Sequence, residues 1–109
     1  MPVSNSMASV EWKPEGLDSL IRYDTWRFSQ GWEPVATELM DAVEAYFCPH
    51  DPSQPARFLP GRPATRRGQP TDLRVVTVEL RSKPFRVFFR YRPARQDFEI
   101  IQVLHPQAQ

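Results

Sequence analysis

The feature that most constrains the fold is a run of alternating apolar and polar residues in the C-terminal part of the chain. Three segments rich in valine, isoleucine and phenylalanine are separated by turn residues: Leu73–Leu80, Phe85–Tyr91 and Phe98–Leu104. This composition is typical of strands joined by hairpins. Because successive side chains of a strand point to opposite faces, the segments predict an antiparallel sheet with one apolar and one mixed face.

The same alternation predicts the register of the first hairpin. Pairing Leu80 with Phe85 across the loop 81–84 makes one face wholly apolar, whereas a slip of one residue would bury Glu79. That face, which we expect helices to cover, consists of Val76, Val78, Leu80, Phe85, Val87 and Phe89. The third strand is expected to add Phe98, Ile100 and Leu104 to it.

Two helices are predicted before these strands. A short strand at Ala8–Trp12 is followed by Pro14, which suits a first helical turn because its missing N–H would be unpaired there anyway. Apolar residues at helical spacing then predict helices over Glu15–Ser29 and from Pro34 to about Phe47, with Gly31 ending the first. Since only a few residues join them, the two should form an antiparallel helical hairpin.

Together these segments predict one α+β domain over residues 1–109, in the order β-α-α-β-β-β, with the helical hairpin packed on the sheet. Residues 48–71 hold six of the twelve prolines and show no periodicity, which predicts a long irregular loop. The loop is also basic, so it is either a solvated segment or one that contacts a nucleic-acid backbone. Its arginines are Arg57, Arg62, Arg66 and Arg67.

Charge is distributed unevenly along the chain. Residues 1–56 hold three basic and nine acidic side chains, net −6, whereas residues 57–109 hold eleven and four, net +7. This asymmetry predicts an acidic partner for the second half, either nucleic acid or an acidic protein segment, unless the two halves attract each other.

Other features narrow the class of protein. No apolar run approaches the length of a membrane span, and Met1–Ala8 lacks the pattern of a secretory signal. A single Cys48 suits a reducing compartment. Its neighbours Pro49 and His50 complete no metal-ligand spacing. We therefore expect a cytoplasmic protein with no metal and no cofactor.

The mixed face of the sheet is where binding or chemistry is expected. In the predicted register Glu79 lies across from Arg86, and Arg90 across from Glu99, and such pairs are often purely structural. The face also carries an apolar patch ringed by arginines, which is typical of a partner-binding surface. We assign partner binding to Phe88, Ile101 and Val103 in the patch and to the surrounding Arg86, Arg90 and Arg92.

Four segments resemble, in the same order, parts of the RelE/ParE superfamily of toxins from bacterial type II toxin–antitoxin systems, the plasmid stabilisation proteins. Val10–Leu20 resembles their first strand and a helix beginning "P-E-A-x-x-D-L", and Leu39–Ala45 resembles their second helix. Leu80–Phe89 resembles their "L-R-x-x-x-Y-R-(aliphatic)-x-Y" hairpin, and Ile100–His105 their last strand, which often ends in "V-L-H". The resemblance spans roughly residues 8–105 and includes the order of strand, two helices and three strands.

The resemblance implies an intracellular bacterial toxin that a cognate antitoxin neutralises by folding on it. RelE-like and HigB-like members cut mRNA on the ribosome, whereas ParE-like members act against DNA gyrase. This chain departs from the RNA-cutting pattern, because Thr77 and Glu79 stand where that branch usually has basic residues. The chain also ends in Pro106–Gln109, where a basic residue and a tyrosine are common.

Metal-independent endoribonuclease chemistry needs a base for the 2′-hydroxyl, a cation for the phosphate and an acid for the leaving oxygen. Glu79 or His105 could act as the base, His105 as the acid and Arg86 as the phosphate clamp. The resemblance carries over Arg86 and matches Arg81 to a second position. Three alternatives stay open: RNA cleavage, toxicity without catalysis, and a non-toxic protein-binding module.

Overall fold

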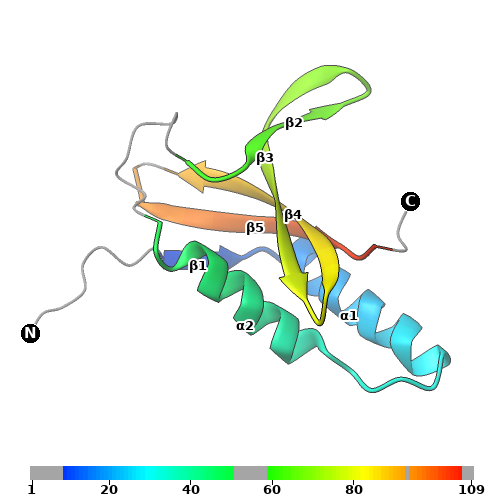
Figure 1. Ribbon diagram of the computed structural model, residues 1–109. Helices are drawn as coiled ribbons and strands as arrows, with labels where there is room; N and C mark the ends of the chain where they lie inside the picture. Colours follow the sequence, from blue (N-terminus) through cyan, green and yellow to red (C-terminus); the bar gives the residue numbers. More distant parts are fainter. Residues whose placement is uncertain (1–8, 51–58, 93, 107–109) are drawn as a thin grey trace, which may run out of the picture.

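The computed structural model describes residues 9–50, 59–92 and 94–106, which form an α+β fold. The elements in chain order are β1 (Ser9–Trp12), α1 (Pro14–Ser29), α2 (Ala36–Phe47), β2 (Arg62–Arg66), β3 (Gln69–Leu80), β4 (Lys83–Arg92) and β5 (Asp97–Leu104). The strands form one mixed sheet in the order β1-β5-β4-β3-β2, in which only the β1–β5 pair is parallel. Figure 1 shows both helices on the same side of this sheet. The predicted α+β class with two helices is confirmed.

The predicted element order was wrong in one respect, because the segment expected to be an irregular loop contains a strand. β2 lies inside residues 48–71, and β3 already begins at Gln69. The hairpin was not predicted because the prolines of this segment indicated a loop. Pro63 is tolerated because β2 is an edge strand, and Pro70 because that part of β3 pairs with β2 alone. Residues 51–58 of the predicted loop lie outside the described residues.

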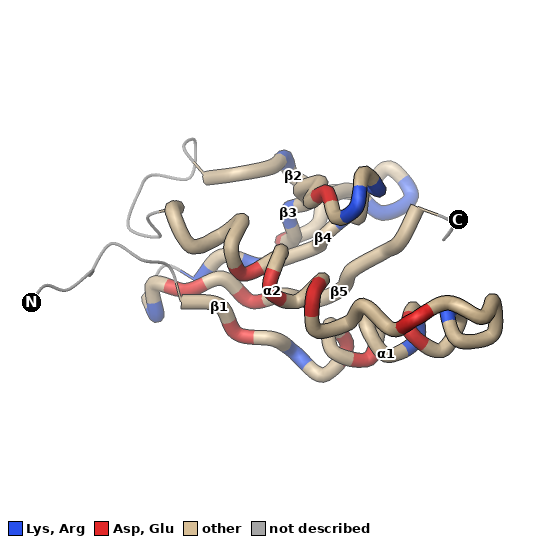
Figure 2. The backbone as a smooth tube through the Cα atoms, turned by 60° about the horizontal axis from the view of Figure 1, so that its bottom comes forward, with Lys and Arg blue, Asp and Glu red and all other residues tan. Residues whose placement is uncertain are grey.

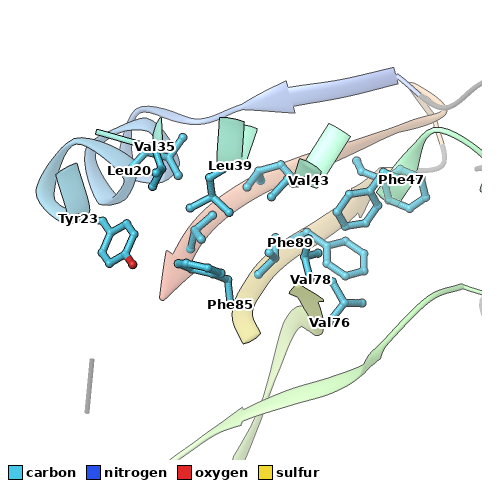
Figure 3. Packing of buried hydrophobic residues seen from close by; sticks show 14 of the residues in the cluster. Leu20, Tyr23, Val35, Leu39, Val43, Phe47, Val76, Val78, Phe85 and Phe89 are labelled. Atoms are coloured by element: carbon cyan, nitrogen blue, oxygen red, sulfur yellow. The ribbon is translucent and has the colours of Figure 1, made fainter. Parts of the chain in front are cut away.

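The hydrophobic core lies between the helices and the predicted apolar face of the sheet (Figure 3). The register of the first hairpin differs from the expected one by two residues, because Leu80 pairs with Lys83 and Val78 with Phe85. An even shift keeps every side chain on its predicted face. The largest fully buried side chains are Phe47, Phe85, Phe89, Phe98, Leu39, Ile100, Val43 and Val87.

The last strand departs further from the prediction, because β5 contains a bulge. Phe89 pairs with Ile100 but Phe88 pairs with Gln102, so Ile101 is an extra residue in β5. Beyond such a bulge the side chains exchange faces. Val103 was expected on the mixed face of the sheet, which the helices leave uncovered and which we call the open face. It is instead 4% exposed and lies in the core. Leu104, expected in the core, lines a hollow on the open face.

Helix α1 occupies the edge of β5 that β1 leaves uncovered. The backbone N–H of Lys13 donates to the carbonyl of Ile100 (3.0 Å). Ser19 Oγ accepts a hydrogen bond from the N–H of Val103 (3.0 Å) and donates one to the carbonyl of Gly16 (2.7 Å). The helix therefore takes the place of a neighbouring strand along this part of β5.

Helix α1 also fixes the start of α2. The two carboxylate oxygens of Asp24 accept hydrogen bonds from the backbone N–H groups of Val35 (2.8 Å) and Ala36 (3.1 Å). These are donors that a helix N-terminus leaves unpaired, and a negative charge there is favourable. One carboxylate of α1 thus caps α2 and sets the geometry of the helical layer.

The close approach of α1 to β5 predicts the effect of enlarging Gly16. A Cβ at this position would lie 2.8 Å from the carbonyl oxygen of Ile100. Gly16→Ala should therefore lower the free energy of unfolding by about 1–3 kcal/mol through overpacking, although alanine is the better helix former by about 1 kcal/mol. Urea denaturation measures this. Thr25→Ala, on the exposed side of the same helix, is the control and should not destabilise. Equal or higher stability of Gly16→Ala would contradict the packing described above.

Candidate functional site

One end of the open face carries a ladder of ion pairs. Arg90 lies opposite Glu99, as predicted, and donates to its Oε1 at 2.6 Å and to Asp72 Oδ2 at 2.7 Å. Arg92 donates to Glu99 Oε2 at 2.7 Å and to both carboxylate oxygens of Asp97 at 2.8 and 2.7 Å. We call this group the ionic ladder; its members are Glu11, which Arg92 also contacts, Lys13, Asp72, Arg90, Arg92, Asp97 and Glu99.

Glu99 is the centre of the ionic ladder. Its side chain is only 4% exposed, and Lys13 Nζ lies 3.5 Å from Oε2. Burial by itself favours the neutral acid, but the hydrogen bond from Arg90 and the charges of Arg92 and Lys13 outweigh it. The pKa of Glu99 therefore lies below its ordinary value of 4.5. A buried carboxylate held by three cations keeps its charge near neutral pH.

The ionic ladder changes the role of two predicted partner-binding residues. Arg90 and Arg92 each bond to two or more carboxylates of their own chain. Their hydrogen bonds to carboxylates also raise the pKa of both guanidinium groups. A partner that used them would first have to break these pairs. The arginine rim predicted around Phe88 is therefore engaged internally at this end of the sheet.

The ionic ladder predicts a pH-dependent loss of stability. Because the pKa of Glu99 is lower in the folded chain than its ordinary 4.5, the contribution of Glu99 is present above about 4.5 and is lost as the pH falls through the folded value. Glu99→Gln should lower the free energy of unfolding by roughly 2 kcal/mol at pH 7. That difference should shrink as the pH falls below about 4.5.

Urea denaturation at several pH values tests this prediction. The control is Glu79→Gln, which removes an exposed carboxylate from the same face and should change stability little at any pH. A difference between Glu99→Gln and the native chain that stays constant from pH 7 to pH 3 would contradict the stabilising role of the ionic ladder.

The other end of the open face is hollowed. A cleft of about 1110 Å³ lies between the β2–β3 hairpin and strands β4 and β5. A smaller hollow of about 230 Å³ adjoins it, and both are lined by Phe88. We call the two together the basic cleft. Its half-buried apolar residues are Leu73, Phe88 and Leu104, and its arginines are Arg62, Arg66, Arg67 and Arg86. Figure 2 shows basic positions gathered on the β2–β3 hairpin, with acidic positions prominent along the helices.

Arg86 lines the basic cleft. In the sheet it pairs with Thr77 on one side and Leu104 on the other, while Glu79 lies opposite Pro84 near the end of the hairpin. The predicted pairing of Glu79 with Arg86 was therefore wrong, because the register is shifted by two residues. No ion pair within the described residues involves the guanidinium of Arg86.

The other predicted catalytic residues lie elsewhere. Arg81 is in the β3–β4 turn and donates two hydrogen bonds to the carboxylate of Glu38 in α2 (3.1 and 2.6 Å), which raises the pKa of the guanidinium. His105 stacks on Tyr23 and Trp26 of α1, with ring centroids 4.6 and 5.4 Å apart. Its side chain thus packs on the helix side of the sheet. The expectation that His105 shares a face with Arg86 was wrong.

The predicted apolar patch is also rearranged by the bulge. Phe88 remains on the open face, but Val103 is in the core. Ile101 lines a separate hollow beside α1, together with Asp18 and Arg22. Sequence reasoning missed Leu104 as the neighbour of Phe88, and no sequence signal marks the bulge that places it there. The hairpin arginines were noted in the sequence, but not their place beside Phe88.

No protein-family model, curated protein or solved structure matches the chain. Within the described residues, no group of three or more His, Cys, Asp or Glu side chains is placed to hold a metal ion. In the same part of the chain, no helix is long and apolar enough to cross a membrane.

Proposed function

We propose that this chain is the toxin of a bacterial type II toxin–antitoxin pair of the RelE/ParE kind. We further propose that it stops growth by binding its target through the basic cleft. Four sequence segments that resemble this superfamily, in the family's order, support the first part. A strand, two helices and a C-terminal antiparallel sheet are compatible with it. The cytoplasm is the compartment that such a role implies.

The observation that carries the proposal is the composition of the basic cleft. Half-buried Phe88 and Leu104 lie beside exposed arginines that are not engaged by carboxylates within the described residues. A guanidinium offers a planar pair of donors that matches a carboxylate. Apolar surface rimmed by such groups fits an acidic segment that also carries apolar anchors. An acidic antitoxin segment would neutralise the chain by covering this surface.

Binding is favoured over RNA cleavage because the cleft lacks a matched acid and base. Among the described residues that line it, Asp72 is the only carboxylic acid. The hydrogen bond from Arg90 holds the pKa of Asp72 below its ordinary 3.8, so near neutral pH it is a charged carboxylate and a poor proton donor. His105 packs against α1. DNA gyrase, the target of ParE-like members, is therefore the proposed target rather than mRNA.

Growth assays on induced bacteria test this function. Inducing the native chain alone should arrest growth, leave transcripts intact by primer extension and raise a DNA-damage response.

Phe88→Ala should weaken target binding by about 2 kcal/mol, roughly 30-fold, because it truncates a central anchor. Arg86→Glu should abolish growth arrest because it reverses the charge beside Phe88 in the cleft. The matched controls are Phe28→Ala on α1 and Lys83→Glu at the start of β4, both exposed and outside the cleft, and both should remain toxic.

Each alternative gives a different result in the same experiment. Transcripts cut after induction, with cutting abolished in Arg86→Glu, would replace gyrase by mRNA as the target. Normal growth on induction of the native chain would overturn toxicity and leave a non-toxic binding module. Arrest that neither Phe88→Ala nor Arg86→Glu relieves would show that the basic cleft is not the acting surface.

A further inference from the structure

The β2–β3 hairpin extends beyond the rest of the sheet. β3 runs over Gln69–Leu80, but it pairs with β4 only from Arg74 onward. Before that point β3 pairs with β2 alone, with Arg66 opposite Gln69. Figure 1 shows this hairpin projecting away from the helices and from the other strands. The outer part of the hairpin is therefore a two-stranded ribbon that pairs with no other strand, and one of its faces lines the basic cleft.

The tip of the ribbon is slender. Arg67 and Gly68 both have positive φ, 54° and 79°, as the central residues of a tight two-residue hairpin turn do. Nothing lies within 4 Å of the position that a Cβ on Gly68 would occupy. Thr65 and Gln69, next to the turn, are exposed polar residues. Apart from Arg66 and Arg67, the described residues next to the turn carry no bulky side chain that would hinder entry of the tip into a groove.

Among the described residues, the charge on the ribbon is largely uncompensated. Arg62, Arg66 and Arg67 are exposed, and within that part of the chain no hydrogen bond or ion pair engages their side chains. The next arginine, Arg74, instead donates to the carbonyls of Pro60 (3.0 Å) and Gly61 (2.9 Å). The one acid of the ribbon, Asp72, is bonded to Arg90. As far as the described residues go, three arginines of the hairpin are therefore available to an external anion.

We propose that the β2–β3 hairpin binds duplex DNA by entering its major groove, with Arg66 and Arg67 at the tip. At about 3.3 Å per residue, residues 69–73 extend roughly 17 Å, whereas the major groove of B-form DNA is about 12 Å wide and 8.5 Å deep and admits a two-stranded ribbon. Phosphates and guanine edges are both ligands for an arginine fork. The major groove of A-form RNA is too narrow for the ribbon. This inference does not depend on whether the chain is a toxin.

Fluorescence anisotropy with purified full-length protein tests the proposal. The probe is a labelled DNA duplex of about 20 base pairs, titrated at salt concentrations from about 50 to 200 mM. Arg66→Ala/Arg67→Ala should weaken binding by roughly tenfold or more and reduce the slope of log affinity against log salt by about 2, or roughly 0.9 for each phosphate that is no longer neutralised. Arg22→Ala/Arg95→Ala, which removes two exposed arginines from α1 and the β4–β5 turn, is the charge-matched control and should bind almost as tightly as the native chain.

The remaining results would overturn the proposal in distinct ways. No binding of the native chain to the duplex excludes a DNA site. Equal weakening in the two double variants means that net charge rather than the ribbon carries the affinity. Equal affinity for single-stranded DNA or for an RNA duplex of the same length excludes the groove. Because this assay uses no living cells, its failure leaves the growth experiment unaffected, and the reverse is also true.

Discussion

In β5, one extra residue at Ile101 reverses the alternation of side chains between the two faces of the sheet. Because of this bulge, Val103 joins Val87 in the core, while Leu104 reaches the open face and lines the same cleft as Phe88. The bulge also lies where β1 ends and α1 takes over the edge of β5. The composition of the basic cleft and the packing of the helical layer therefore both depend on this irregularity.

The open face then divides according to where its charges are compensated. At one end, the acids of β1, β3 and β5 surround the arginines of β4 and form the ionic ladder around buried Glu99. At the other end, the hairpin arginines and Arg86 have no such neighbours among the described residues. The charge asymmetry of the sequence thus has two outcomes. Arg81 with Glu38, Arg92 with Glu11 and Lys13 with Glu99 join the two halves of the chain, while the basic cleft keeps its positive charge.

The alternation of side chains along a strand determines which parts of the sheet could be predicted from the sequence. The core face of β3 and β4 was correct despite a wrong turn, because a register shift of two residues preserves the faces. That turn was wrong because Arg81 and Ser82 have positive φ, 53° and 65°, where glycine or asparagine would have marked a tight turn. The bulge at Ile101 could not be predicted, since no glycine marks it. The β2–β3 hairpin was missed because prolines normally indicate a loop. Arg86 and His105 lie on different faces because of the bulge, which turns the side chains of Val103 and His105 to the helix side of the sheet.

Thiol labelling of two adjacent positions tests the central claim most directly, since it reports which residue of β5 faces the cleft. With the half-buried Cys48 replaced by serine, Leu104→Cys and Val103→Cys are compared for reaction with a charged thiol reagent under native conditions. We expect the thiol at 104 to react at least roughly tenfold faster, and the thiol at 103 to react only as the chain opens. Faster labelling at 103 would show that β5 has no bulge at Ile101, and would contradict the cleft described for this protein.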